Sequence, residues 1–156
     1  MRCPISCRAG DSLTKPGDTV GILGLAYKPG TNVIEQSYAL ELARQLGVER
    51  RAVVGWDPLA MEEARREMGS SLVLAQTPEE CLRSAKLVVI VNPMPELATI
   101  DWSVGDATVM DCWRSLPVEA VKQISCYLPL GNTHGDNRVP GLTNVGVFEH
   151  LGLLTN

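Results

Sequence analysis

Aromatic side chains, basic charge and long apolar runs are all scarce in this sequence of 156 residues. Only 4% of the residues are aromatic, so the core must be aliphatic, and the 45% hydrophobic fraction is enough to build one. A net charge of −4 argues against a general nucleic-acid binder, which would show a basic face. No apolar run reaches the roughly 18 residues that a membrane span needs. The N-terminus also lacks the apolar centre of a secretory signal, so we expect a cytoplasmic protein with no membrane partner.

Grouped metal ligands are also lacking. The five cysteines are an odd number without a secretion signal, which favours reduced thiols. Cys3 and Cys7 are close enough to share a metal, but His134 and His150 are isolated, so no second pair of ligands matches them. The three later cysteines are expected to be small buried hydrophobic residues. Cys112 has no identifiable base beside it, so we predict neither a metal site nor a catalytic residue.

Strand and helix patterns alternate along most of the chain. Residues 1–18 are polar and rich in Pro and Gly, which predicts a disordered leader or linker before a single domain at residues 19–156. Apolar strand patterns occupy residues 19–26, 51–57, 71–76, 86–93, 107–112 and 125–130, and helical patterns residues 37–47, 58–69, 77–85 and 116–124. Residues 131–143 have the composition of a loop, and residues 144–154 fit either a strand or a helix. The alternation predicts an α/β fold, a doubly wound parallel sheet in a Rossmann-like three-layer sandwich, with the very apolar residues 86–93 at its centre.

Local signals mark the ends of the predicted helices. Ser37 and Thr77 are predicted N-caps, and Glu80 is the acid of a capping box after Thr77. Gly47 is predicted to end the first helix. Asp57 could bind a ribose, but we favour a helix N-cap role for it, with the helix opening at Pro58.

The segment TVGILGLAYKPGTNVIEQS at residues 19–37 is the most informative part of the sequence. It joins an apolar strand to a helix start through a Gly turn and a long polar loop, a junction that favours phosphate-bearing ligands. Lys28 in this loop and Arg114 after the fifth strand would lie at the same sheet edge and could hold a diphosphate together. From position alone, two solvated loop charges are an equal alternative. The Gly pattern is not G-x-G-x-x-G, and the insertion before the helix is too long for a dinucleotide loop.

The same segment resembles the G-L-A-F-K-P-x-T-D-D-x-R-x-S motif of the UDP-glucose/GDP-mannose dehydrogenase family, which opens that family's C-terminal UDP-binding domain. Three further segments are similar to family segments in the same order: VVGWDPLAMEEARREMG, TPEECLRSAKLVVIVNPMPEL and VMDCWRSL. The resemblance covers roughly residues 18–130. The family's NAD-binding start and its catalytic cysteine segment do not occur in this sequence.

The resemblance implies a set of ligand-binding residues. Tyr27 and Lys28 would face a nucleotide sugar and Arg114 would bind its phosphates, with further rim contacts expected from Thr31, Asn92, Glu96 and Trp113. The family's Asp-Asp pair is Asn32-Val33 here, and Glu35 replaces an Arg that is thought to reach the NAD phosphates. We therefore expect no cofactor on this chain alone, although NAD is implied for the full-length family enzyme.

The resemblance implies a UDP- or nucleotide-sugar-binding domain of an oxidoreductase that makes polysaccharide precursors. The chain alone is expected to be non-catalytic, and its partners would be a UDP-sugar and either a second copy or separate dehydrogenase domains. A stand-alone nucleotide-sugar sensor and a degenerate oligomerisation domain are the alternatives. The identity of the sugar is open at this stage.

Overall fold

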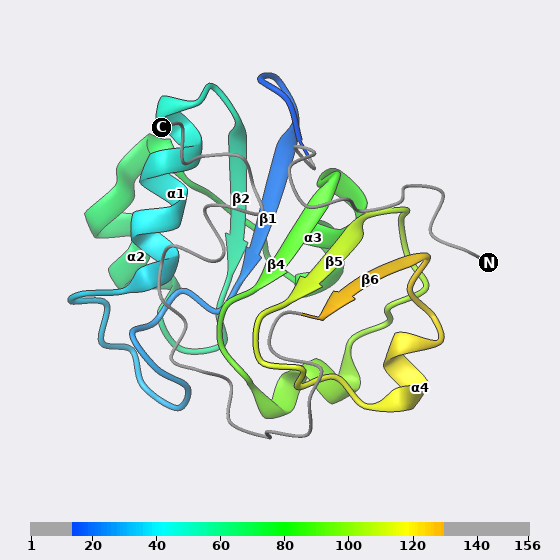
Figure 1. The fold of residues 1–156 in the computed structure, drawn as a ribbon. Helices are drawn as coiled ribbons and strands as arrows, with labels where there is room; N and C mark the ends of the chain where they lie inside the picture. Colours follow the sequence, from blue (N-terminus) through cyan, green and yellow to red (C-terminus); the bar gives the residue numbers. More distant parts are fainter. Residues whose placement is uncertain (1–13, 130–156) are drawn as a thin grey trace.

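The computed structural model describes residues 14–129, and a six-stranded parallel sheet forms its centre. The strand order is β3-β2-β1-β4-β5-β6, and every neighbouring pair is parallel. Figure 1 shows the sheet with β1 and β4 in its middle. The strands are β1 (Thr19–Leu23), β2 (Ala52–Trp56), β3 (Val73–Leu74), β4 (Leu87–Ile90), β5 (Thr108–Asp111) and β6 (Cys126–Pro129). The predicted doubly wound sheet and the central place of residues 86–93 are confirmed.

Helices cover both faces of the sheet and make the fold a three-layer sandwich. Helices α1 and α2 lie over one face and α3 over the other, and α4 is a single turn beside β6 (Figure 1). Two short 3₁₀ helices, η1 and η2, follow α2 and β4. The bounds are α1 (Tyr38–Val48), α2 (Met61–Met68), η1 (Gly69–Ser71), α3 (Pro78–Ser84), η2 (Pro95–Thr99) and α4 (Val118–Val121).

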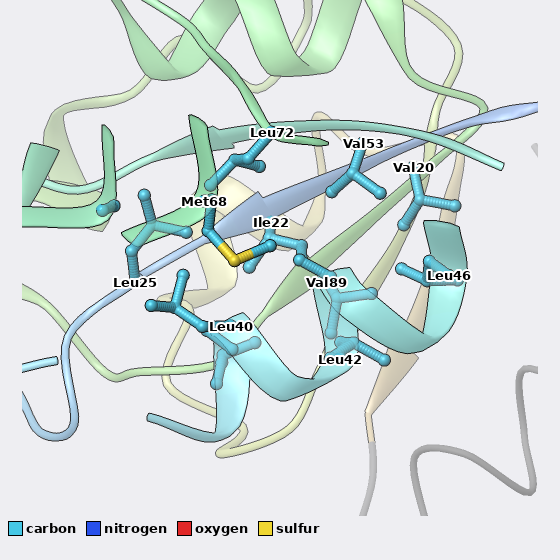
Figure 2. Packing of buried hydrophobic residues seen from close by; sticks show 14 of the residues in the cluster. Val20, Ile22, Leu25, Leu40, Leu42, Leu46, Val53, Met68, Leu72 and Val89 are labelled. Atoms are coloured by element: carbon cyan, nitrogen blue, oxygen red, sulfur yellow. The ribbon is translucent and has the colours of Figure 1, made fainter. Parts of the chain in front are cut away.

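The two faces of β1 divide the core between these layers. Val20 and Ile22 pack under α1 in one cluster, and Leu23 belongs to the cluster on the α3 side. Figure 2 shows side chains of α1, Leu40 and Leu42 among them, packed onto the β1 side chains. The alternation follows from the period of two along a strand, since successive side chains point to opposite faces.

The end of α1 differs from the prediction. The helix runs one residue past Gly47, to Val48, and the left-handed residue after it is Arg50, with φ of 62°. The Arg50 amide donates to the Gly47 carbonyl at 3.0 Å and the Arg51 amide to the Leu46 carbonyl at 2.9 Å. This is a Schellman ending, in which an Arg occupies the position that usually carries Gly.

The start of α2 departs from the prediction, and the start of α3 agrees with it in position but not in its capping hydrogen bonds. Helix α2 begins at Met61 rather than at Pro58, because the chain bends at residues 58 and 59 first. Thr77 is the N-cap of α3 and Pro78 its first residue, as predicted, but the Thr77 side chain makes no capping hydrogen bond. The Glu80 carboxylate instead accepts from the Gln76 amide at 2.8 Å, so its capping-box role reaches one residue further back than expected.

Residues 14–18 contact the folded domain, although the sequence predicts a domain that begins at residue 19. Thr14 is buried, and its hydroxyl accepts from Arg51 Nε at 2.6 Å. The Asp18 carbonyl accepts from the Ala52 amide at 3.1 Å, which continues the pairing beside β2. The sequence does not predict these contacts, because they join residues more than thirty positions apart. The predictions for residues 1–13, 131–143 and 144–154 fall outside the described residues.

Three cysteines lie in the described part of the chain. Cys81 and Cys112 are buried free thiols, and burial raises the pKa of each to about 12. They are therefore the unreactive hydrophobic residues that the sequence predicts. Cys126 is disulfide-bonded, so the expectation of reduced thiols is wrong there. Between residues 14 and 129, no helix combines the length and the apolar character needed to cross a membrane.

Candidate functional site

The carboxyl edge of the sheet carries a small pocket where the strand order reverses. The loops after β1, β2 and β4 enclose about 120 Å³ there. Four predicted ligand residues line it, namely Lys28, Thr31, Asn92 and Glu96. Tyr27, Trp113 and Arg114, the other predicted contacts, are not among the lining residues.

Asp57, at the end of β2, anchors the root of the β1 loop. Its Oδ2 accepts from the amides of Leu25 at 2.7 Å and Ala26 at 3.1 Å. Its Oδ1 accepts from the amides of Leu59 at 2.8 Å and Ala60 at 2.9 Å. The side chain is 4% exposed. Asp57 therefore holds two loops together instead of acting as the N-cap of α2, which is Ala60.

Asn92 fastens the same loop from the end of β4. Its Nδ2 donates to the Ala26 carbonyl at 2.8 Å, and the side chain is buried. Gly24 makes this approach possible, since a Cβ there would lie 2.8 Å from the Asn92 Cβ. Gly24 also has a φ of +93°, which other residues rarely adopt. A structural role for Asn92 was missed from the sequence, where it was only a rim contact.

Ser37 fixes the far end of the β1 loop. Its hydroxyl donates to the Leu25 carbonyl at 2.6 Å and accepts from the Leu40 amide at 3.3 Å, so the predicted N-cap is confirmed. The Tyr27 amide donates to the Val33 carbonyl at 2.7 Å and closes the loop. Residues 28–32 therefore form the loop tip, and the Lys28 side chain is exposed on it.

The turn after β5 is built around one carboxylate. Asp111 is fully buried, and its Oδ1 accepts from the Trp113 amide at 3.1 Å and the Ser115 hydroxyl at 3.3 Å. Its Oδ2 accepts from the Leu116 amide at 3.1 Å and the Tyr127 hydroxyl at 2.7 Å. A buried carboxylate is stabilised by such donors, and the turn takes its shape from them.

Arg114 lies inside this turn with an exposed side chain and a φ of 51°, in the left-handed region. The Trp113 ring nitrogen donates to the Val91 carbonyl, which ties the turn to the end of β4. Burial, and next the hydrogen bond to Asp111, raise the pKa of Tyr127 above its ordinary value. The Tyr127 hydroxyl is therefore protonated, and able to donate, across the neutral range.

A second hollow lies beside the start of α1 and has a negative lining. It measures about 500 Å³ and includes Glu35, Glu41, Glu67 and Arg44. Arg44 is paired with Glu67 at 2.9 Å and with Glu41 at 3.6 Å. Three carboxylates against one paired guanidinium disfavour the phosphates of a dinucleotide.

The described residues do not fit NAD. Both oxygens of Asp57, at the position of a ribose-binding acid, are occupied by backbone amides. The groove beside α1 has the wrong charge for a pyrophosphate. Within residues 14–129, no three His, Cys, Asp or Glu side chains are grouped so that they could hold a metal ion.

The sequence profile of one protein family matches most of this domain. It is described as the UDP binding domain of the UDP-glucose/GDP-mannose dehydrogenase family, and it matches residues 21–117. The match includes both Lys28 and Arg114, the two exposed cations of the carboxyl edge.

Individual proteins similar to this chain are UDP-glucose dehydrogenases. UDP-glucose 6-dehydrogenase AglM of Haloferax volcanii is 35% identical over 85 residues, which are 54% of this chain and 20% of that protein. UDP-glucose 6-dehydrogenase of Rickettsia prowazekii is 30% identical over 115 residues, 69% of this chain and 26% of that protein. A solved UDP-glucose dehydrogenase from Pyrobaculum islandicum superimposes with a TM-score of 0.63 and 31% identity, over 73% of this chain and 25% of that one. The chain thus spans only about a quarter of the length of these relatives.

Proposed function

Because the chain belongs to the UDP-glucose/GDP-mannose dehydrogenase family and carries its UDP binding domain, we propose that it forms one side of a nucleotide-sugar site. The observation that carries the proposal is the pair of exposed cations, Lys28 and Arg114, on two firmly anchored loops at one edge of the sheet. Separate NAD-dependent dehydrogenase domains complete the site and perform the oxidation. The chain alone binds without catalysing.

The two cations suit a diphosphate. Lys28 follows β1 and Arg114 follows β5, and β4 lies between these strands. Two strand spacings separate their roots by about 10 Å, a distance that two long side chains can span to reach one ligand. Lys supplies a mobile point charge and Arg a planar fork, so together they favour a diphosphate over a single carboxylate.

The size of the pocket indicates that the site is incomplete on this chain. At about 120 Å³ it is smaller than the roughly 300–1,000 Å³ of typical small-molecule sites. Large apolar side chains are exposed on the same edge, with Tyr27 at 53%, Leu59 at 54% and Trp113 at 37%. An apolar rim around charged groups is typical of a surface that meets another protein surface. We therefore assign the rest of the nucleotide-sugar site to a second domain or chain.

Titration calorimetry with UDP, UDP-glucose and GDP-mannose tests the proposal. Lys28→Ala and Arg114→Ala should each weaken binding by about 1–3 kcal/mol, the scale of a charge-assisted hydrogen bond. Lys86→Ala is the matched control, because Lys86 is an exposed lysine just before β4, at the opposite edge of the sheet. If the two variants bound as tightly as Lys86→Ala, the assigned site would be wrong.

Two further measurements separate the alternatives. The isolated chain with UDP-glucose and NAD should produce no NADH above background, and production of NADH would contradict a binding-only role. Binding of UDP together with failure to stimulate or join any dehydrogenase domain would favour a sensing module. A stable oligomer without nucleotide binding would favour an oligomerisation domain.

A further inference from the structure

We propose that Asp111 and Tyr127 are positioning residues that hold Arg114 in its ligand-binding orientation. This inference rests on the proposed function, since it assigns a task to the residues behind one of the two proposed cations. It concerns residues that do not themselves contact the ligand.

The residues that donate hydrogen bonds to Asp111 flank Arg114 in the sequence. The bonded groups are the amide of Trp113 on one side, and the hydroxyl of Ser115 and the amide of Leu116 on the other. Arg114 itself has a φ of 51°, a conformation that is unfavourable for a residue with a side chain. The bonds to the carboxylate favour this conformation, and their loss would let the turn relax toward a common backbone conformation, which would redirect the Arg114 side chain.

Tyr127 fixes the carboxylate in turn. Its hydroxyl donates to Asp111 Oδ2 at 2.7 Å from β6, the neighbouring strand. The same oxygen accepts from Leu116, so the tyrosine sets the rotation of the carboxylate that the turn wraps around. Strained backbone at a binding site persists only when the surroundings over-determine it, and the Tyr127–Asp111 pair supplies that restraint.

Tyr127→Phe is the main test, measured as UDP affinity by calorimetry at millimolar nucleotide. Loss of the hydroxyl should lower affinity about threefold to tenfold. Tyr38→Phe is the matched control, because Tyr38 is a partly buried tyrosine on α1, beside the other groove. The readout specific to positioning is a double-mutant cycle, in which Tyr127→Phe has no further effect once Arg114 is Ala.

Ser115→Ala keeps the test valid if Tyr127→Phe fails to fold. It removes one donor to Asp111 from a half-buried side chain and leaves β6 untouched, so a smaller loss of affinity in the same direction is expected. Melting curves followed by circular dichroism establish that each variant is folded before titration.

The outcomes separate this inference from the proposed function. If Arg114→Ala does not weaken binding, or the parent chain binds no nucleotide, the proposed function fails and takes this inference with it. If Arg114→Ala weakens binding and neither Tyr127→Phe nor Ser115→Ala does, only this inference is overturned. An equal loss from Tyr127→Phe with and without Arg114 would show a general structural effect and would also overturn it.

Discussion

The loop after β1 and the turn after β5 are both held by a buried aspartate, but the two aspartates act over different distances. Asp57 binds the amides of Leu25 and Ala26, which lie 32 and 31 positions earlier in the chain. Asp111 binds within its own turn, as far as Leu116 five positions later. The first loop therefore depends on the assembled sheet, whereas the second depends mainly on its own local sequence, with added hydrogen bonds from Tyr127 on β6 and from the Trp113 ring to the Val91 carbonyl.

At the carboxyl edge of the sheet, the acidic and the basic side chains have different surroundings. Acidic residues at the ends of parallel strands are the usual candidates for ribose or catalytic contacts. Here both are buried and bind backbone amides, while Lys28 and Arg114 are exposed. The carboxylates shape the loops, and the two cations that the loops carry are exposed.

Removing either aspartate should produce the largest loss of stability. Asp57→Ala and Asp111→Ala each leave buried amides without acceptors, at about 1–3 kcal/mol per group, so we expect a loss of about 3 kcal/mol or more. Urea denaturation measures it. Asp101→Ala is the control, because that exposed carboxylate bonds locally to Ser103, and it should cost less than about 1 kcal/mol.

Hydrogen exchange sharpens the comparison between the two loops. Asp57→Ala should speed exchange at the amides of Leu25 and Ala26, and Asp111→Ala at those of Trp113 and Leu116. Faster exchange in both loops from either single change would show that they are one cooperative unit, and the contrast drawn between them would be wrong.

Gly24→Ala should disturb the loop after β1 and leave the turn after β5 unchanged. A Cβ at Gly24 would meet the Asn92 Cβ at 2.8 Å and the Asn92 backbone nitrogen at 3.1 Å, with φ at +93°. Strain and overpacking together should lower the free energy of unfolding by about 2–4 kcal/mol. Gly47→Ala is the control within α1, since a Cβ there would meet no neighbouring atom within 4 Å, and it should stabilise by about 0.5–1 kcal/mol. Equal changes in the free energy of unfolding from the two substitutions would mean that the close Gly24–Asn92 contact does not affect stability.

The sheet could be predicted because its signals are local. Apolar runs such as residues 86–93 and helical stripes such as that of α1 alternate in order, and short connections leave few topologies. The residues that the family resemblance implies as ligand contacts also follow the carboxyl ends of these strands. The short helix η2 is not predicted, since Pro93 and Pro95 before and at its start are typical of a loop.

The anchoring of the site could not be predicted in the same way. Asn92 donates to a carbonyl 66 positions earlier, and Asp57 bonds across more than thirty positions, so no local pattern carries these contacts. Asp111 is different, because the following residues, Cys-Trp-Arg-Ser-Leu, form a turn within reach of its own carboxylate. The complete burial of Asp111, which the sequence does not show, decides its role.

Glycine substitution at two strained arginines separates strain from function. Arg50 and Arg114 have φ values of 62° and 51°, so Arg50→Gly and Arg114→Gly should each stabilise the fold, by about 0.5–1 kcal/mol in thermal unfolding. Only Arg114→Gly should weaken UDP binding, because Arg50 ends α1 at the other edge of the sheet. Loss of affinity from both changes would point to a global effect of the substitutions.

Charge reversal at Glu35 has the smallest expected effect and tests the far end of the β1 loop. Glu35 lines the negative groove two residues before the Ser37 cap, where the dipole of α1 favours negative charge. Glu35→Arg should therefore lower stability by about 0.3–1 kcal/mol, and an exposed ion pair with Glu41 would offset only part of this. Glu49→Arg, the same reversal at the opposite end of α1, should stabilise by a similar amount. UDP affinity should stay within about threefold of the parent in both variants. A large gain in affinity from Glu35→Arg alone would show that the nucleotide contacts the negative groove beside α1. The ligand would then lie over α1 rather than between Lys28 and Arg114.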